Sequence, residues 1–209
     1  MLRVFRRSAP TSRAERGEPP CWIDGFLPRR RCEAMLEELR WAFWKPSTVV
    51  RPAADGALCS TTSPVRVSES TYEEWFSDRL RKEVRLIEER LAAVFGIRPE
   101  QCEQWQATRY HPGGTFEYHF DAGYWAHEPA GERDRTVLIY LQSPIEGGST
   151  CFRELDLEIQ PHAGRLVVWN NLLPNGERDP ASIHAAAPVV RGMKTVLVTW
   201  TRERDVKPR

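Results

Sequence analysis

The sequence predicts an α+β fold that is mainly β: a distorted double-stranded β-helix, or jelly roll, with N-terminal helices packed on one face. Helical periodicity is confined to the first half of the chain, whereas the second half consists of short β-prone runs separated by Gly, Pro, Asn and Asp. Many short, evenly spaced strands are typical of a jelly roll. The length of 209 residues favours one domain, which we expect at 21–209, after a disordered segment at 1–20.

The bulk composition is that of an ordinary soluble globular protein, with 41% hydrophobic residues, 28% charged residues and a net charge of +1. A balanced charge argues against a dedicated nucleic-acid partner. No apolar run approaches the ~20 residues of a membrane span, so we expect no membrane partner either. The sequence does not indicate the oligomeric state.

The N-terminal segment and the cysteines both favour a cytoplasmic location. Residues 1–20 are rich in Arg, Ser and Pro, and they lack the apolar stretch of a secretory signal. The five cysteines are widely spaced without a C-x-x-C pair, which disfavours a disulfide framework or a zinc knuckle. Free thiols in a reducing cytoplasm are therefore expected.

Two helices are expected in the first half of the chain. The first covers 32–44, where apolar residues recur at helical spacing, and Lys45-Pro46 ends it. The second begins near Ser70 and Glu73, which have the spacing of a capping box, and it ends at Gly96. Its apolar stripe comprises Trp75, Leu80, Val84, Ile87, Leu91 and Val94.

Between the helices, residues 47–68 contain Pro52, Gly56 and Pro64 and lack helical periodicity, so we expect a loop with one short strand at most. A long loop in a compact domain is often functional, so it could cover a site. Eight β-prone runs follow in the second half, at 104–110, 116–121, 135–142, 149–152, 157–160, 166–169, 185–190 and 195–202.

A candidate metal site lies at the end of one of these runs. Alternate side chains of a strand point to the same face, so His119 and Asp121 are expected to point together. His184 begins another candidate strand and could supply a third ligand. Two histidines and one carboxylate on one face of a metal leave three positions open, as in non-haem Fe(II) oxygenases. A bidentate co-substrate can take two of these positions and O2 the third.

The chain resembles the prolyl 4-hydroxylase-like branch of the 2-oxoglutarate oxygenases. The resemblance lies in the order of its motifs over about 104–202, with a weaker echo, WIDGFL, at 22–27. These motifs are RYHPGG at 109–114, YHFD at 118–121, RTVLIYL at 135–141, EGGSTCF at 146–152, PHAG at 161–164 and WN at 169–170, followed by His184, Pro188-Val189, Gly192-Met193-Lys194 and Trp200. Ser149 departs from the family, which often has an acidic residue there.

The resemblance implies specific roles for these residues. His119, Asp121 and His184 match the iron ligands, and Lys194, ten residues after His184, matches the partner of the distal carboxylate of 2-oxoglutarate. Three further residues match the co-substrate pocket: Tyr110 and Thr136 as hydroxyl groups that bond 2-oxoglutarate, and Trp200 as an aromatic lining. An intact Asp121 favours hydroxylation over halogenation, because related halogenases have a small residue there.

The resemblance also implies the activity: Fe(II)- and 2-oxoglutarate-dependent hydroxylation of an unactivated C–H, with O2 as oxidant and ascorbate as a stimulant. The expected substrate is an amino acid, with proline the first candidate, free or within a peptide or protein. Tyr124 and Trp125 directly follow the metal motif, so residues 122–134 and 47–68 could flank the substrate. Plain packing of these two aromatics in a solvated loop is the alternative.

Two other functions stay open at this point. One is a cupin-type metal enzyme that does not use 2-oxoglutarate, and the other is a non-catalytic barrel that only binds a ligand. The cupin alternative gives no reason for a buried lysine ten residues after the last metal ligand, so Lys194 distinguishes the two enzymes. The non-catalytic alternative predicts no metal-dependent formation of succinate.

Overall fold

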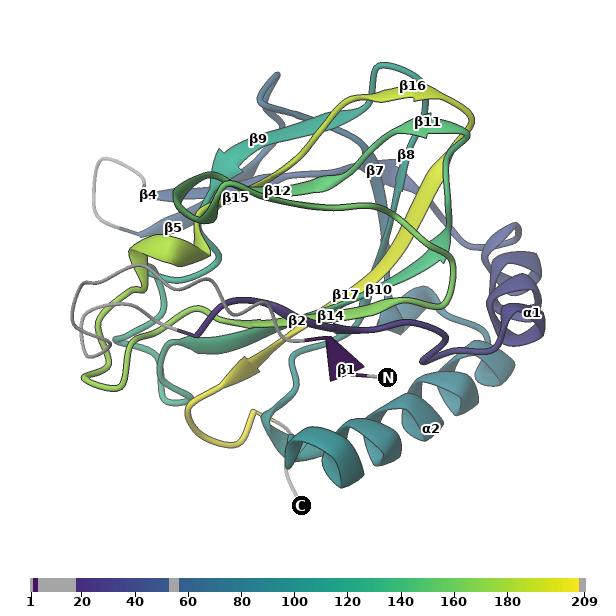
Figure 1. Ribbon diagram of the computed structural model, residues 1–209. Coiled ribbons are helices and arrows are strands. Elements are labelled where there is room, and N and C mark those ends of the chain that lie inside the picture. Colours follow the sequence, from purple (N-terminus) through teal and green to yellow (C-terminus); the bar gives the residue numbers. More distant parts are fainter. Residues whose placement is uncertain (1, 4–17, 53–56, 207–209) are drawn as a thin grey trace.

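Two β-sheets face each other, and two helices cover the outer side of the larger sheet (Figure 1). The computed structural model describes residues 2–3, 18–52 and 57–206. The predicted jelly-roll-like fold with helices on one face is confirmed. Among the described helices, none is both long enough and apolar enough to cross a membrane.

The larger sheet has eight antiparallel strands. In spatial order they are β1 (Leu2–Arg3), β2 (Cys21–Ile23), β14 (Leu166–Asn170), β10 (Arg133–Gln142), β17 (Lys194–Arg202), β8 (Gln106–Tyr110), β7 (Glu69–Tyr72) and β3 (Lys45–Pro46). The two longest strands, β10 and β17, lie side by side in its centre.

The smaller sheet has five strands and carries most of the candidate metal site. Its order is β13 (Leu157–Ile159), β12 (Thr150–Phe152), β15 (His184–Ala186), β9 (Thr115–His119) and β6 (Arg66–Val67). Two further strand pairs are β11 (Glu146–Gly147) with β16 (Val189–Arg191), and β4 (Val49–Pro52) with β5 (Leu58–Thr61). Short 3-10 helices occur at η1 (Glu73–Trp75), η2 (Pro99–Gln101), η3 (Arg153–Leu155) and η4 (Pro180–Ser182).

The alternation of side chains along the central strands divides the interior into two cores. On β10, Val137 and Ile139 pack with the helices in one apolar cluster. Tyr140, on the opposite face of the strand, packs between the two sheets with Phe152 of the smaller sheet. This second cluster therefore supplies the apolar packing between the two sheets.

The eight predicted β-prone runs each contain a strand. The run at 185–190 is divided into β15 and β16 around Pro188, because proline cannot donate a ladder hydrogen bond. Asp121 lies two residues beyond the end of β9 rather than within the strand.

Both helices begin at other residues than predicted, and the first also ends earlier. Helix α1 (Arg29–Leu39) ends five residues before the predicted end, so Phe43 lies outside the helix and is 65% exposed. Helix α2 (Asp78–Phe95) is capped by Ser77, whose Oγ accepts a hydrogen bond from the Leu80 N–H. The predicted capping box was wrong, because Ser70 lies in β7 and Glu73 begins η1.

The predicted end of the second helix is confirmed at Gly96, which has a φ of 64° and donates its N–H to the Ala92 carbonyl. Residues 47–68 were predicted to hold one strand at most, but they contain β4, β5 and β6. Of the segment 1–20, residues 1 and 4–17 lie outside the described residues, and Leu2–Arg3 pairs with β2.

Candidate functional site

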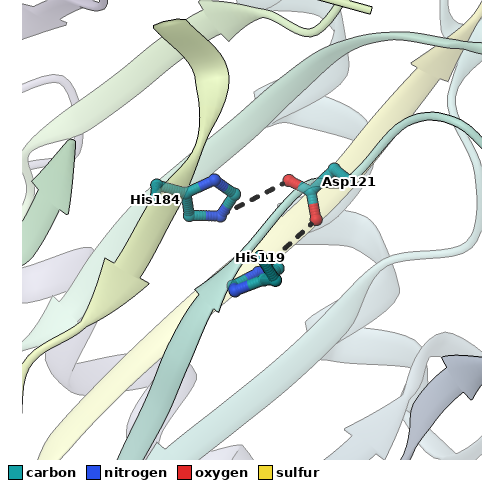
Figure 2. Close-up of side chains that lie close together, drawn as sticks. All are labelled: His119, Asp121 and His184. Atoms are coloured by element: carbon teal, nitrogen blue, oxygen red, sulfur yellow. Dashed lines mark ion pairs between the residues drawn. The ribbon is translucent and has the colours of Figure 1, made fainter. Parts of the chain in front are cut away.

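Three candidate metal ligands meet at the edge of the space between the sheets (Figure 2). His119 is the last residue of β9 and His184 is the first residue of β15, and these two residues are register partners in the antiparallel pair. Asp121 follows β9 by two residues. The candidate ligand atoms of the three side chains all lie within 4.8 Å of one another. The pairing of β9 with β15 therefore brings together residues that are 65 positions apart in the sequence.

Backbone carbonyls fix both imidazole rings. His119 Nδ1 lies 2.8 Å from the Glu117 carbonyl oxygen, and His184 Nδ1 lies 2.9 Å from the Ser182 carbonyl oxygen. Each carbonyl can only accept, so Nδ1 carries the proton and Nε2 keeps its lone pair for a metal. The Nε2 atoms of His119 and His184 lie 3.8 Å and 3.6 Å from the two oxygens of Asp121.

The protonation states also suit metal binding. Burial, together with the nearby His184, lowers the pKa of His119, so its ring is neutral at neutral pH, as a ligand must be. Burial alone would raise the pKa of Asp121. Interactions with His184, His119 and Arg133, together with the hydrogen bond from Thr136, outweigh this effect and hold the pKa of the carboxyl below its ordinary value. Two imidazoles and one carboxylate are a donor set that fits a divalent iron ion.

A cavity of about 570 Å³ opens beside these three side chains. It is lined by the inward faces of β8, β10 and β17, by the ends of β9 and β15, and by the hairpin of β4 and β5. The lining includes His119, Asp121 and His184 together with the predicted Tyr110, Thr136, Lys194, Trp200, Tyr124 and Trp125. The structure thus places every predicted site residue around one space.

Lys194 is the most unusual residue in this lining. Its side chain is only 1% exposed, and its Nζ donates a hydrogen bond to the Gly148 carbonyl at 2.8 Å and lies 4.4 Å from the centre of the Tyr110 ring. Among the described residues, no carboxylate forms an ion pair with it. Burial lowers its pKa to about 7. A buried ammonium without an acidic partner is costly unless an anion binds there, so this residue fits the carboxylate of a ligand.

Tyr110 and Trp200, which the resemblance assigned to the co-substrate pocket, lie on the same sheet as Lys194. Tyr110 ends β8 and is the register partner of Lys194, so the two side chains share one face of the larger sheet. Trp200 lies further along β17, and the guanidinium of Arg133 stacks 3.8 Å from its ring centre. The Trp200 indole N–H is buried and has no hydrogen-bond partner among the described residues.

Thr136 has partners that the resemblance did not indicate. Its Oγ1 lies 2.7 Å from Asp121 Oδ2 and 2.9 Å from Asn171 Nδ2. The expected role was a hydrogen bond to 2-oxoglutarate, but this hydroxyl is already engaged behind the candidate metal ligand.

Thr150 is a lining residue that sequence reasoning missed. It is buried, lies two residues after Gly148, and its hydroxyl is 2.6 Å from the Tyr140 hydroxyl. The run 149–152 was predicted as a strand, and alternation would have placed Thr150 and Phe152 on one face and Cys151 on the other. This alternation could have indicated that the Thr150 hydroxyl points inward.

Arg66 is a second missed residue. It lies on β6, lines the cavity, stacks 4.6 Å from the Phe116 ring centre and donates to the Thr48 carbonyl at 2.9 Å. It belongs to the segment 47–68 that was expected to cover a site, and that segment does line the cavity through Thr48, Val49, Val50, Arg51, Ser60, Val65 and Arg66. The chemistry of this segment could not be assigned from its composition.

Tyr124 and Trp125 lie in the segment between β9 and β10. Tyr124 is 37% exposed, whereas the Trp125 ring lies near the guanidinium groups of Arg133 and Arg202. The indole N–H of Trp125 is buried and, like that of Trp200, has no hydrogen-bond partner in the part of the chain that the structure describes. Two unpartnered donors therefore lie at the same end of the cavity.

Comparison with known proteins agrees with this geometry. The family model of the 2OG-Fe(II) oxygenase superfamily matches residues 105–202, the part that contains the three candidate ligands and Lys194. This chain belongs to that superfamily. Within it, the chain lies in the prolyl 4-hydroxylase-like branch: it is 36% identical over 151 residues to the prolyl 4-hydroxylase subunit alpha-1 of Gallus gallus, which is 69% of this chain and 28% of that protein.

Two further relatives cover more of their own length. Prolyl 4-hydroxylase 13 of Arabidopsis thaliana is 28% identical over 200 residues, which is 88% of this chain and 70% of the plant protein. The crystal structure of the viral collagen prolyl hydroxylase from Paramecium Bursaria Chlorella virus-1 in its 2OG complex has a TM-score of 0.62 and 25% identity. That match covers 88% of this chain and 95% of the viral chain. The chain spans less than a third of the length of the Gallus gallus subunit.

Proposed function

We propose that this protein is an Fe(II)- and 2-oxoglutarate-dependent oxygenase that hydroxylates a prolyl residue. One observation carries the proposal: the cavity that contains the two imidazoles and one carboxylate also contains a buried lysine with no acidic partner among the described residues. A metal enzyme that does not bind an anionic co-substrate has no use for this lysine.

In the proposed site, His119, Asp121 and His184 hold the iron, and Lys194 binds the distal carboxylate of 2-oxoglutarate. The iron and its co-substrate, when bound, supply oxidative decarboxylation of 2-oxoglutarate to succinate and CO2 coupled to C–H hydroxylation. The hydroxyl groups of Tyr110 and Thr150 lie in the cavity wall and could orient the co-substrate.

The prime substrate in this proposal is proline, within a peptide or protein or as the free amino acid. The support is the branch of the superfamily, whose similar members are named as prolyl 4-hydroxylases. The segment at 122–134 and the strand pair β4 and β5 both contribute to the lining, which supports a role of both in contacting the substrate. Tyr124 and Trp125 supply aromatic surface, and the Trp125 indole supplies an N–H donor that pairs with no described residue.

We also propose a cytoplasmic location, supported by five widely spaced cysteines without a C-x-x-C pair. A nucleic-acid substrate finds no support in the net charge of +1.

The decisive experiment is an anaerobic titration of the purified protein with Fe(II) and 2-oxoglutarate. We expect a weak metal-to-ligand charge-transfer band in the visible that requires both components. Succinate release should then increase when a prolyl peptide or free proline is added in the presence of O2 and ascorbate. A protein that binds Fe(II) but shows neither the band nor succinate release would contradict the proposal and favour the cupin-type alternative.

A further inference from the structure

An aromatic track leads from the rim of the cavity to the surface of the protein. Tyr72 ends β7 and lines the cavity, and its ring centre lies 5.6 Å from that of Trp75 in η1. The ring of Phe43 lies 5.3 Å from Trp75. Both pairs pack edge to face, at 84° and 85°. We use "aromatic track" for Tyr72, Trp75 and Phe43.

The outer end of the aromatic track is exposed. Phe43 is 65% exposed, and Trp41 in the same segment is 84% exposed. Single exposed apolar residues are common in soluble proteins, but a row of contacting rings that begins in a cavity wall is a continuous surface. Lys45 lies beside this row, with its Nζ 5.0 Å from the Tyr72 ring centre and 4.7 Å from that of Trp75, and no carboxylate of the described residues forms an ion pair with it.

We propose that the aromatic track binds the part of a proline-rich peptide substrate that flanks the residue held in the cavity. This inference rests on the proposed function. Proline-rich chains adopt the polyproline II conformation, which has no internal hydrogen bonds and presents ring faces and free carbonyl groups. Such chains dock on aromatic surfaces. The exposed ring of Phe43 supplies apolar surface, and the Lys45 ammonium, which lies over the Tyr72 and Trp75 rings, supplies a donor for a peptide carbonyl.

The test compares two substrates in steady-state kinetics of the full chain. One is a short prolyl peptide that fills only the cavity, and the other is a proline-rich peptide of about 15 residues, long enough at about 3.1 Å per residue to reach the track. For Phe43→Ser we expect KM for the long peptide to rise about tenfold, the factor that corresponds to about 1.4 kcal/mol, with kcat unchanged. KM for the short peptide should stay the same.

Ile145→Ser is the matched control, because Ile145 is 70% exposed and belongs neither to the track nor to the cavity lining. It should leave both substrates unaffected. Equal KM values for parent and Phe43→Ser with the long peptide would overturn the inference while leaving the proposed function intact. If neither peptide stimulates succinate release by the parent protein, the proposed function itself fails. A dimer of the parent that Phe43→Ser dissociates would instead assign the track to a second copy of this chain.

A different observation supports a second inference, about the hydroxyl behind Asp121. The Asn171 amide donates to Thr136 Oγ1 at 2.9 Å, and the single proton of that hydroxyl has two acceptors in reach, Asp121 Oδ2 at 2.7 Å and Asn171 Oδ1 at 3.2 Å. The shorter distance favours donation to Asp121 Oδ2. Both side chains are fully buried. Asn171 is itself fixed, because its N–H donates to the Asp134 carbonyl and its carbonyl accepts from the Asp179 N–H.

We infer that Thr136 and Asn171 are positioning residues whose hydrogen bond to Oδ2 favours metal binding by Asp121 through one oxygen. A carboxylate that binds through both oxygens would occupy one of the positions that a chelating co-substrate and O2 require. The hydrogen bond from Thr136 competes with that second contact. The pair would therefore keep the coordination sphere open without touching the metal.

Thr136→Val tests this inference, because it replaces only the hydroxyl in nearly the same volume, and Thr136→Ser restores the hydroxyl. We expect Thr136→Val to change the affinity for Mn(II) by about tenfold to 100-fold and to change the visible spectrum of the Co(II)-substituted protein. Thr136→Ser should match the parent in both measurements. If Thr136→Val unfolds at the parent temperature and matches the parent in both readouts, the inference is overturned.

Discussion

Lys194 carries its charge in a deeply buried position. An anionic ligand would supply the charge partner that the described residues do not supply. Removing one partner of a buried charge pair costs about 2–5 kcal/mol. Lys194→Met should therefore weaken 2-oxoglutarate binding by at least about 30-fold in an anaerobic titration, while Fe(II) binding is retained. Lys82→Met, at an exposed position of α2, is the control and should bind as the parent does. Unchanged affinity in Lys194→Met would favour an enzyme that does not use 2-oxoglutarate.

The same residue makes the binding of 2-oxoglutarate pH-dependent. Burial lowers the pKa of Lys194 to about 7 in the free protein, and a bound carboxylate raises it. Below pH 7 the ammonium is already charged. Above pH 7 binding requires the uptake of a proton, so the affinity should fall by up to about tenfold per pH unit. Calorimetry in two buffers of different ionisation enthalpy measures this uptake.

Lys194→Arg separates this effect from general changes with pH, because a guanidinium remains charged throughout the range. If this variant still binds 2-oxoglutarate, its affinity should not change with pH. A flat profile in the parent protein between pH 6 and pH 9 would contradict the prediction.

At the scale of single residues, the sequence could predict those site residues that lie close together in the chain or that belong to a long series of family motifs. His119 and Asp121 are two positions apart, so their approach is a local property. The partner of Thr136 could not be predicted in this way. It depends on how β10 of the larger sheet faces Asp121, which follows a strand of the smaller sheet, and on Asn171, which follows β14.

At the scale of elements, α2 shows which apolar residues stabilise the fold. The predicted stripe included both Leu91 and Val94, but Leu91 is fully buried whereas Val94 is 53% exposed. Leu91→Ala should lower the free energy of unfolding by about 2–5 kcal/mol, because it leaves a cavity against the larger sheet. Val94→Ala should change it by less than about 0.5 kcal/mol. Denaturant titration of both variants measures these two changes in the free energy of unfolding. Equal changes would contradict the distinction between a buried Leu91 and an exposed Val94.

The helix boundaries illustrate why some elements were predictable and others were not. Gly96 ends α2 because of its own backbone conformation, which is a local property. Ser70 and Glu73 have the spacing of a cap, but Ser70 is committed to β7 by pairing with Thr108 of β8, 38 residues away. The same cause explains residues 47–68, where β6 forms only by pairing with Phe116 and Thr115 of β9. Tertiary pairing overrides local preference in both cases.

At the scale of the whole molecule, ligand binding should stabilise the fold, because the three candidate ligands are assembled only in the folded state. A ligand at 100 times its dissociation constant adds about 2.7 kcal/mol. Mn(II) with 2-oxoglutarate, in the absence of turnover, should therefore raise the unfolding temperature, and EDTA should reverse the rise. Asp121→Ala is the control and should show a much smaller shift. An equal shift in that variant would place the metal elsewhere.

The architecture was predictable because strand alternation and helical periodicity are strong patterns over many residues. The arrangement of the two layers was not, since the order of strands in each sheet follows from non-local pairs such as β8 with β17 and β9 with β15. The cavity depends on this arrangement, so its lining residues Thr150 and Arg66 appeared only with the structure.

The two anchoring points of the proposed co-substrate belong to different layers: the imidazoles come from the smaller sheet and Lys194 from the larger one. The length of a five-carbon diacid is fixed, whereas the distance between the layers depends on interlayer side chains such as Tyr140, Phe152 and Trp169. A substitution in that packing could therefore alter selectivity between diacids of different chain length without contacting either anchor. Evolution of co-substrate preference in this protein would then proceed through its hydrophobic interior as readily as through its polar groups.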